Sequence, residues 1–182
     1  MPFEFEKTNI EGVLVVKPRI FGDERGFFLE TYKKDDFENN GIKGNFIQDN
    51  HSKSKKGVIR GIHLQKGEYS QAKIVRCIRG ALWDVAVDLR KNSKTFGKWF
   101  AIELSEKNKY MLYVPKGCGH GFAALTENVE MEYKNDNLYS FENEMGVKWD
   151  DKNLNIKWPV ENPLISEKDN LLPSLSEFEK KL

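Results

Sequence analysis

The chain has 182 residues, and its 29 Lys and Arg against 28 Asp and Glu give a formal net charge of +1. This balance argues against a general nucleic-acid or membrane binder, which would usually be strongly basic, although a local site for an anionic small molecule remains possible. With no run near the roughly 18 apolar residues of a membrane span, no signal-peptide core in MPFEFEK and two cysteines (Cys77 and Cys118), we expect one cytoplasmic domain over residues 1–182.

Short apolar runs follow one another along the chain, separated by Gly, Pro, Asn or Lys. The first strands are expected within residues 13–18, 26–32 and 45–52, and a short helix over 33–41 is expected to end at Gly41. Further strands are expected within residues 57–65, 72–80, 81–89, 98–104, 110–115, 121–125 and 129–134. Short strands at this spacing predict an all-β protein, a double-sheet sandwich or barrel, rather than a βαβ fold.

The segment 81–89 shows the alternation of a strand most plainly. Trp83, Val85, Val87 and Leu89 alternate with Leu82, Asp84, Ala86 and Asp88. Asp84 is a candidate for a pocket wall, and Asp88 is expected to cap a turn. The large aromatic residues are expected in the core: Phe27, Phe28, Trp83, Trp99 and Phe122.

The C-terminal segment has a different composition. From about Glu142 it contains Pro159, Pro163 and Pro173 and many Asn and Asp residues. This composition predicts an irregular segment packed over the β core. Near its end, Ser174 and Glu177 have the spacing of a capping box, which predicts a last turn of helix.

The stretch GVIRGIHLQ, residues 57–65, sets polar side chains into an apolar strand, where burial without partners is costly. Its frame resembles the metal-binding strand of cupins, which carries two histidines one residue apart and is followed by a later histidine. Here His63 and the later His120 are present, but Gln65 occupies the second histidine position. An amide oxygen is a poor ligand for a transition metal, so we expect no metal site.

His63 then needs another role. Taken alone, it would be a hydrogen-bonded histidine in a barrel wall. However, strand periodicity places His63 and Gln65 on one face, and Lys73 and Tyr133 can meet them from neighbouring strands. A histidine, a lysine and a tyrosine inside one barrel are costly to bury unless they are functional.

Several long motifs resemble the dTDP-4-dehydrorhamnose 3,5-epimerase family, and they occur in family order between Phe21 and Asp169. They are FGDERGFFLETY, FIQDNHSKSKKGVIRGIHLQ, QAKIVRCIRGALWDVAVDLRKNSKTFGKW, VPKGCGHGF, YKNDNLY and LISEKD. The resemblance implies a cupin or jelly-roll β-barrel, a homodimer, a dTDP-sugar substrate and catalysis without a metal or other cofactor.

The resemblance also implies catalytic roles. The 4-keto group of the substrate acidifies the hydrogens on carbons 3 and 5, so that a base forms an enolate and an acid on the opposite face returns a proton. His63 would be the base, with a usual pKa of about 6.5, and Tyr133 the acid, with a usual pKa of about 10. Asp169 would orient His63, and Lys73 would stabilise the enolate oxygen.

Binding roles follow from the same resemblance. Arg25, Arg60 and Lys168 would contact the diphosphate or the sugar. Sugar hydroxyls or the base would be held by Gln48, Asp49, Asn50, Glu30 and Glu144. His120 would line the sugar pocket and Tyr139 would stack on thymine. Arg25 and Glu30 would reach the pocket of the neighbouring subunit.

Alternatives remain open at this stage. Leu64 and Leu138 replace residues that are usually aromatic in the family, so the exact nucleotide sugar and the number of inverted carbons stay undecided. A 3,4-ketoisomerase would not need Tyr133, and a non-catalytic sugar-binding cupin would need neither Tyr133 nor Asp169. A metal-dependent dioxygenase is disfavoured by Gln65.

Overall fold

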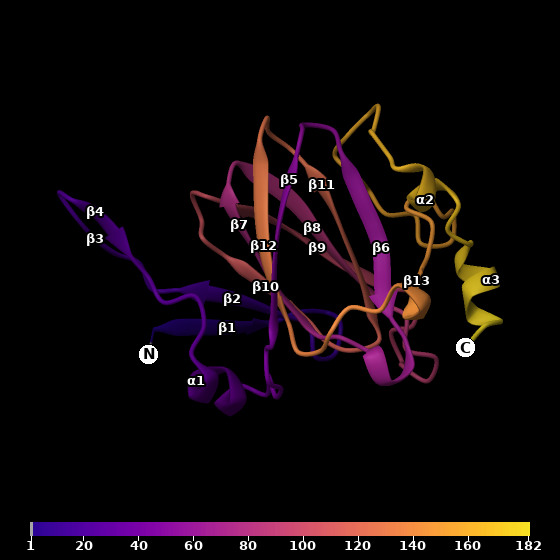
Figure 1. The fold of residues 1–182 in the computed structure, drawn as a ribbon, viewed down its shortest axis with the longest axis horizontal. Helices are drawn as coiled ribbons and strands as arrows, with labels where there is room; N and C mark the ends of the chain where they lie inside the picture. The colour runs from indigo at the N-terminus through magenta and orange to yellow at the C-terminus, as the bar shows by residue number, and fades with distance from the viewer. Residues whose placement is uncertain (1) are drawn as a thin grey trace.

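The computed structural model describes residues 2–182, and two antiparallel sheets face each other in it (Figure 1). The six-stranded sheet has the order β1 (Phe3–Lys7), β2 (Leu14–Pro18), β10 (Met111–Val114), β7 (Lys73–Arg79), β12 (Val129–Asn135), β5 (Gln48–Ser54). The five-stranded sheet has the order β13 (Glu144–Gly146), β6 (Ile59–Gln65), β11 (Cys118–Ala124), β8 (Ala81–Asp88), β9 (Trp99–Ser105). The predicted all-β double-sheet fold is confirmed.

The main core lies between the two sheets. Strand β8 shows how the alternating pattern is used: Leu82 and Ala86 belong to this inner cluster, whereas Val85 and Val87 belong to a second cluster on the outer face. The strand is therefore covered on both faces, which explains why six of its eight residues are apolar and why its two aspartates, Asp84 and Asp88, are buried rather than solvated.

Two different segments cover the outer faces of the sheets. Helix α1 (Lys34–Asn39) buries Phe37 against Phe3 and Ile74 on the six-stranded sheet, and Gly41, at φ +86°, follows its end as predicted. The C-terminal segment buries Leu154 and Phe178 against the five-stranded sheet, on the right of Figure 1.

The C-terminal segment is largely irregular, as predicted, with two short helices, α2 (Glu167–Asn170) and α3 (Leu175–Glu179). The capping box of Ser174 and Glu177 is present at the start of α3. The segment also supplies an unexpected strand, because residues 144–146 pair with the end of β6 as β13. Two 3₁₀ turns complete the elements, η1 (Gly67–Tyr69) and η2 (Phe141–Asn143).

A small hairpin of β3 (Phe21–Asp23) and β4 (Gly26–Phe28) projects from the body of the molecule (Figure 1). The prediction that Phe27 and Phe28 belong to the core is wrong, because these side chains are 59% and 65% exposed. The two side chains border an open cavity beside β7 and Lys109, and they are not enclosed between the sheets. Of the other predicted core aromatics, Phe122 is buried, while Trp83 and Trp99 are half-buried against the outer cluster.

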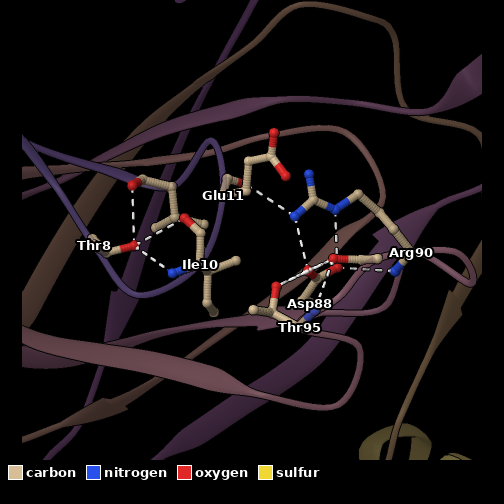
Figure 2. Close-up of polar contacts among 8 residues, drawn as sticks. Thr8, Ile10, Glu11, Asp88, Arg90 and Thr95 are labelled. Atoms are coloured by element: carbon tan, nitrogen blue, oxygen red, sulfur yellow. Dashed lines mark hydrogen bonds and ion pairs between the residues drawn. The ribbon is translucent and has the colours of Figure 1, made fainter.

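Asp88, at the end of β8, organises the loop that follows (Figure 2). Its two carboxylate oxygens accept hydrogen bonds from the Arg90 backbone N–H and guanidinium and from the hydroxyls of Ser93 and Thr95. Arg90 also donates to the Glu11 carbonyl in the turn between β1 and β2. The predicted turn cap is thus confirmed, and it joins the two sheets.

Strands β6 and β11 approach closely at two glycines. A Cβ atom on Gly61 would lie 2.5 Å from Gly121 Cα, and one on Gly121 would lie 2.7 Å from the Arg60 carbonyl oxygen. Side chains there would push the strands apart. This contact sets His63 directly opposite His120 in the strand register. Across residues 2–182, no helix combines the length and apolar composition needed to cross a membrane.

Candidate active site

A cavity of about 530 Å³ opens between the two sheets. Strands β5, β6, β7, β11 and β12 form its walls, and residues 164–166 with the start of α2 close one side. Seven of the predicted site residues line it: Arg60, His63, Lys73, His120 and Tyr133 from the strands, and Lys168 and Asp169 from α2. Segments that are up to about a hundred residues apart in the chain therefore meet in one space.

His63 and Asp169 form a hydrogen-bonded pair in this cavity. The His63 Nε2 atom lies 2.7 Å from Asp169 Oδ1, and Asp169 is 3% exposed. The Gly61 N–H donates to the other carboxylate oxygen at 3.3 Å, while Ser166 caps the helix that carries Asp169. Burial disfavours the charged carboxylate, but the hydrogen bonds from His63, Gly61 and Ser166 outweigh it and hold the pKa of Asp169 below its usual value. The geometry therefore suits a base oriented by an ionised carboxylate.

Lys73 and Tyr133 lie together on the opposite sheet. The Lys73 ammonium is 5.2 Å from the centre of the Tyr133 ring. Its two hydrogen-bond acceptors are neutral, Gln71 Oε1 and Asn135 Oδ1, each at 3.4 Å. Burial lowers the pKa of Lys73 to about 8 and raises the pKa of Tyr133. A lysine without a carboxylate partner at contact distance keeps its charge available for a developing oxyanion.

A second histidine–carboxylate pair stands on the neighbouring strands. His120 Nε2 lies 2.7 Å from Asp84 Oδ1, and both residues are buried. The Asp84 Oδ2 atom has no hydrogen-bond partner among the described residues. Sequence reasoning named both residues as pocket candidates but missed that they pair.

Glu144, which lies beside the cavity lining, contacts two predicted binding residues and the predicted base. It accepts hydrogen bonds from the Tyr139 hydroxyl and from Lys168 Nζ, both at 2.6 Å, and lies 3.9 Å from His63 Nε2. The hydrogen bond to Glu144, with burial, raises the pKa of Tyr139 to about 12. Burial opposes the charge of Glu144, yet Lys168, Tyr139 and His63 together lower its pKa.

Several predicted residues lie elsewhere. Gln48 and Asn50 point to the same face of β5, and Asn50 interacts with Tyr133, whereas Asp49 points the other way and pairs with Lys134 at 2.8 Å. Arg25, at the tip of the β3–β4 hairpin, pairs with Asp23 at 2.6 Å. Neither Arg25 nor Glu30 lines the cavity of its own chain.

Gln65 does not line the cavity, although it follows His63 on the same strand. Sequence reasoning also missed Ser52 and Ser166, which do line it, and Gln71 and Asn135, which hold Lys73. The parity of β5 and β12 contained a signal for Ser52 and Asn135, since each lies two residues from a predicted site residue. Ser166 and Gln71 lie outside regular strands, where parity predicts nothing.

Comparison with known proteins identifies the family. The family model described as dTDP-4-dehydrorhamnose 3,5-epimerase matches residues 7–177. The chain belongs to this family. The epimerase of that name from Shigella flexneri is 53% identical over 164 residues, which cover 90% of this chain and 91% of that protein.

Two further relatives carry names that concern the substrate and the number of carbons inverted. The crystal structure of dTDP-6-deoxy-D-glucose-3,5-epimerase from Legionella pneumophila in complex with dTDP-4-keto-L-rhamnose has a TM-score of 0.92 and 39% identity, covering 96% of this chain and 93% of that one. The dTDP-4-dehydrorhamnose 3-epimerase from Streptomyces niveus is 40% identical over 162 residues, covering 88% of this chain and 78% of that protein.

Proposed function

We propose that this epimerase-family protein converts dTDP-4-dehydro-6-deoxyglucose to dTDP-4-dehydrorhamnose by inverting carbons 3 and 5. The observation that carries the proposal is one cavity with His63, paired with Asp169 of α2, on one sheet and with Lys73 beside Tyr133 on the other. A base and an acid on opposite walls are the arrangement that an inversion through a planar enolate requires.

The chemistry follows from the charges at these groups. His63 removes the proton on carbon 3 or 5, and Asp169, which the hydrogen bonds keep ionised, stabilises the imidazolium that forms. The electrons move to the oxygen on carbon 4, where the Lys73 ammonium stabilises the enolate. Tyr133, whose pKa burial raises, stays protonated until it delivers its proton to the opposite face. Before the second inversion His63 releases the abstracted proton to solvent and Tyr133 takes one up, and the same steps then occur at the other carbon.

Substrate binding is assigned to the rim. Arg60 and Lys168 provide positive charge for the diphosphate, Tyr139 provides an aromatic face for thymine, and Gln48, Asn50, Glu144 and His120 provide polar contacts. For Asp49 the pairing with Lys134 supports a structural role instead.

A homodimer is part of the proposal. The β3–β4 hairpin exposes Phe21, Phe27 and Phe28 and carries Arg25 at its tip, so a second copy could cover these apolar side chains and receive Arg25 and Glu30 at its pocket. Sedimentation of the purified protein measures this state directly. We also propose that the protein acts in the cytoplasm, where dTDP-sugars would be its substrates, and that it needs no metal.

Inversion of carbon 3 alone is the main alternative, because the relative from Streptomyces niveus carries that name at 40% identity. The higher identity to a 3,5-epimerase favours two inversions. A 3,4-ketoisomerase and a non-catalytic sugar binder are disfavoured by the position of Tyr133 across the cavity from His63.

Proton exchange in deuterated water tests the mechanism and the number of carbons together. Wild-type protein should exchange and invert both carbons 3 and 5, as followed by NMR. Tyr133→Phe removes the hydroxyl but keeps the ring, so exchange through His63 should persist while inversion falls about a hundredfold or more. The matched control His63→Ala should lose exchange and inversion alike.

If Tyr133→Phe lowers exchange and inversion by the same factor, Tyr133 does not act after enolate formation and the two-wall mechanism is wrong. Exchange at carbon 3 alone in the wild-type protein would establish the single-carbon alternative. Activity that disappears with a chelator and returns with a divalent ion would contradict the metal-free reaction.

A further inference from the structure

Gln65 is a buried amide that the proposed chemistry does not use. It is 4% exposed, it lies outside the cavity lining, and it occupies the position where a cupin would carry a metal-binding histidine. Its Oε1 atom accepts a hydrogen bond from the Ser140 backbone N–H at 3.1 Å. The side chain therefore points to the residue that follows Tyr139 in the chain.

The segment 136–143, which we call the Tyr139 loop, is held mainly by polar contacts. Its large apolar side chains are exposed, with Leu138 at 55%, Tyr139 at 50% and Phe141 at 76%. Core packing therefore does little to fix the Tyr139 ring. What remains are hydrogen bonds from strands of both sheets and from residues 68–71, which precede β7.

Three glutamine side chains make the central contacts with the Tyr139 loop. Gln48 Oε1 accepts from the Tyr139 N–H at 3.0 Å, Gln65 Oε1 accepts from the Ser140 N–H at 3.1 Å, and Gln71 Nε2 donates to the Asn137 carbonyl at 2.8 Å. Gln48 is also a proposed ligand contact, and Gln71 also contacts Lys73. Gln65 differs from both, because its hydrogen bond goes to the loop alone.

Other contacts at the end of β6, where Gln65 lies, also hold the Tyr139 loop. Lys66, the next residue, donates its N–H to the Asn143 carbonyl at 2.9 Å, and Gln65 stands opposite Glu144 in the pairing of β6 with β13. The end of β6 thus holds the loop on both sides of η2. Glu144 in turn accepts a hydrogen bond from the Tyr139 hydroxyl, so the end of β6 holds the Ser140 backbone through Gln65 and lies beside the residue that holds the Tyr139 ring.

We propose that Gln65 is a positioning residue for nucleotide recognition: through the Ser140 N–H it fixes the Tyr139 ring at the cavity rim, where the ring receives a pyrimidine base. The inference rests on the proposed function, since it takes Tyr139 as the base-stacking residue. It also accounts for a buried amide beside the proposed catalytic base. The amide holds the loop that binds the nucleotide, while His63 acts on the sugar.

Two substitutions at Gln65 separate the hydrogen bond from the volume of the side chain. Gln65→Met keeps the length but removes the acceptor, and Gln65→Glu keeps an oxygen at the same place. Thr126→Val is the matched control, because the Thr126 hydroxyl likewise accepts a backbone N–H, that of Ala81, at a turn that does not line the cavity. Calorimetric titration with dTDP and steady-state kinetics are the measurements.

Gln65→Met should raise the dTDP dissociation constant and KM about tenfold, equivalent to about 1.4 kcal/mol. The kcat should stay within about twofold, because loop positioning affects ground state and transition state alike. Gln65→Glu should bind dTDP within about threefold of the wild type, and Thr126→Val should bind it unchanged. Unchanged dTDP binding by Gln65→Met, or equal weakening by Gln65→Met and Gln65→Glu, would overturn the inference.

Amide hydrogen exchange of the wild-type protein supplies a test that needs no variant. The Ser140 N–H should be protected without ligand, because Gln65 already holds it, and exchange at the rate of a free amide would refute the inference. A wild-type protein that fails to bind dTDP would instead refute the proposed function. The two failures are therefore distinguishable.

Discussion

Two buried polar regions on the same strand, β8, are built in opposite ways. At the end of the strand, both oxygens of Asp88 are engaged by Arg90, Ser93 and Thr95, and the cluster in Figure 2 closes on itself. In the middle of the strand, Asp84 engages His120 with one oxygen and leaves the other without a partner among the described residues. Both carboxylates are 0% exposed.

Other buried polar atoms in and beside the cavity lack hydrogen-bond partners, as Asp84 Oδ2 does. Ser52 Oγ in its wall and Asn135 Nδ2 beside Lys73 also lack partners among residues 2–182. An unsatisfied buried polar atom costs about 1 to 3 kcal/mol, so a fold retains such atoms where a bound molecule or water can complete them. The Asp88 cluster stabilises a loop, whereas the unpartnered atoms in and beside the cavity are available to a ligand.

Replacing Asp169 or Asp88 with Asn tests whether each carboxylate serves catalysis or stability. Asp169→Asn should have the largest effect. An amide cannot stabilise the imidazolium of His63, so kcat/KM should fall about a thousandfold, or about 4 kcal/mol. The free energy of unfolding in urea should change by only about 1 kcal/mol. A variant that loses stability but retains kcat/KM would place Asp169 with Asp88 as a structural group.

Asp88→Asn should show the reverse pattern, with a loss of about 2 to 3 kcal/mol in the free energy of unfolding and kcat within about twofold. Burial opposes the charge of Asp88, but the hydrogen bonds from Arg90, Ser93 and Thr95 lower its pKa to about 2. A carboxylate with a lowered pKa stabilises the fold fully above its unfolded pKa of about 3.9. The difference between wild type and variant should thus narrow as the pH falls from about 4 through 2, and a constant difference over that range would contradict the assignment.

The smallest effect is expected in the pH profile, through Lys73. Because burial lowers its pKa to about 8, kcat/KM should fall about tenfold for each pH unit above that value. Of the groups that face Lys73, Glu144 on β13 has a lowered pKa and Tyr133 on β12 a raised one, so neither titrates near pH 8. Lys73→Arg should lose this alkaline decline, since a guanidinium stays charged. A wild-type profile that is flat to pH 10 would show that the charge of Lys73 is not needed.

Much of the fold and part of the site could be read from the chain. Alternation at 81–89, the capping box at Ser174 and the glycine after α1 are local signals, and each appears in the structure as predicted. His63, Lys73 and Tyr133 were placed in one pocket from strand parity, and the family motifs added Asp169. These predictions needed no knowledge of which strands are neighbours beyond the face that each residue occupies.

The alternation of residues along a strand does not show what packs against each face of that strand. This explains which predictions were wrong. Asp49 alternates correctly with Gln48 and Asn50 but points to Lys134 rather than to the cavity. Phe27 and Phe28 look like core residues because their hydrophobicity is local information, whereas the projection of their hairpin from the body of the molecule is not. The strand at residues 144–146 exists because β6 offers an edge, which composition cannot reveal.

The sequence by itself determined the double-sheet class, the family and the residue types of the site, because these depend on periodicity and on motifs that are contiguous in the chain. Only the tertiary structure decided which polar groups are satisfied and which are left open. Gln65 and Ser140 are 75 residues apart, and His63 and Asp169 are 106 apart. Contacts over such separations depend on strand order and register, which arise from the packing of all the strands together rather than from any one of them.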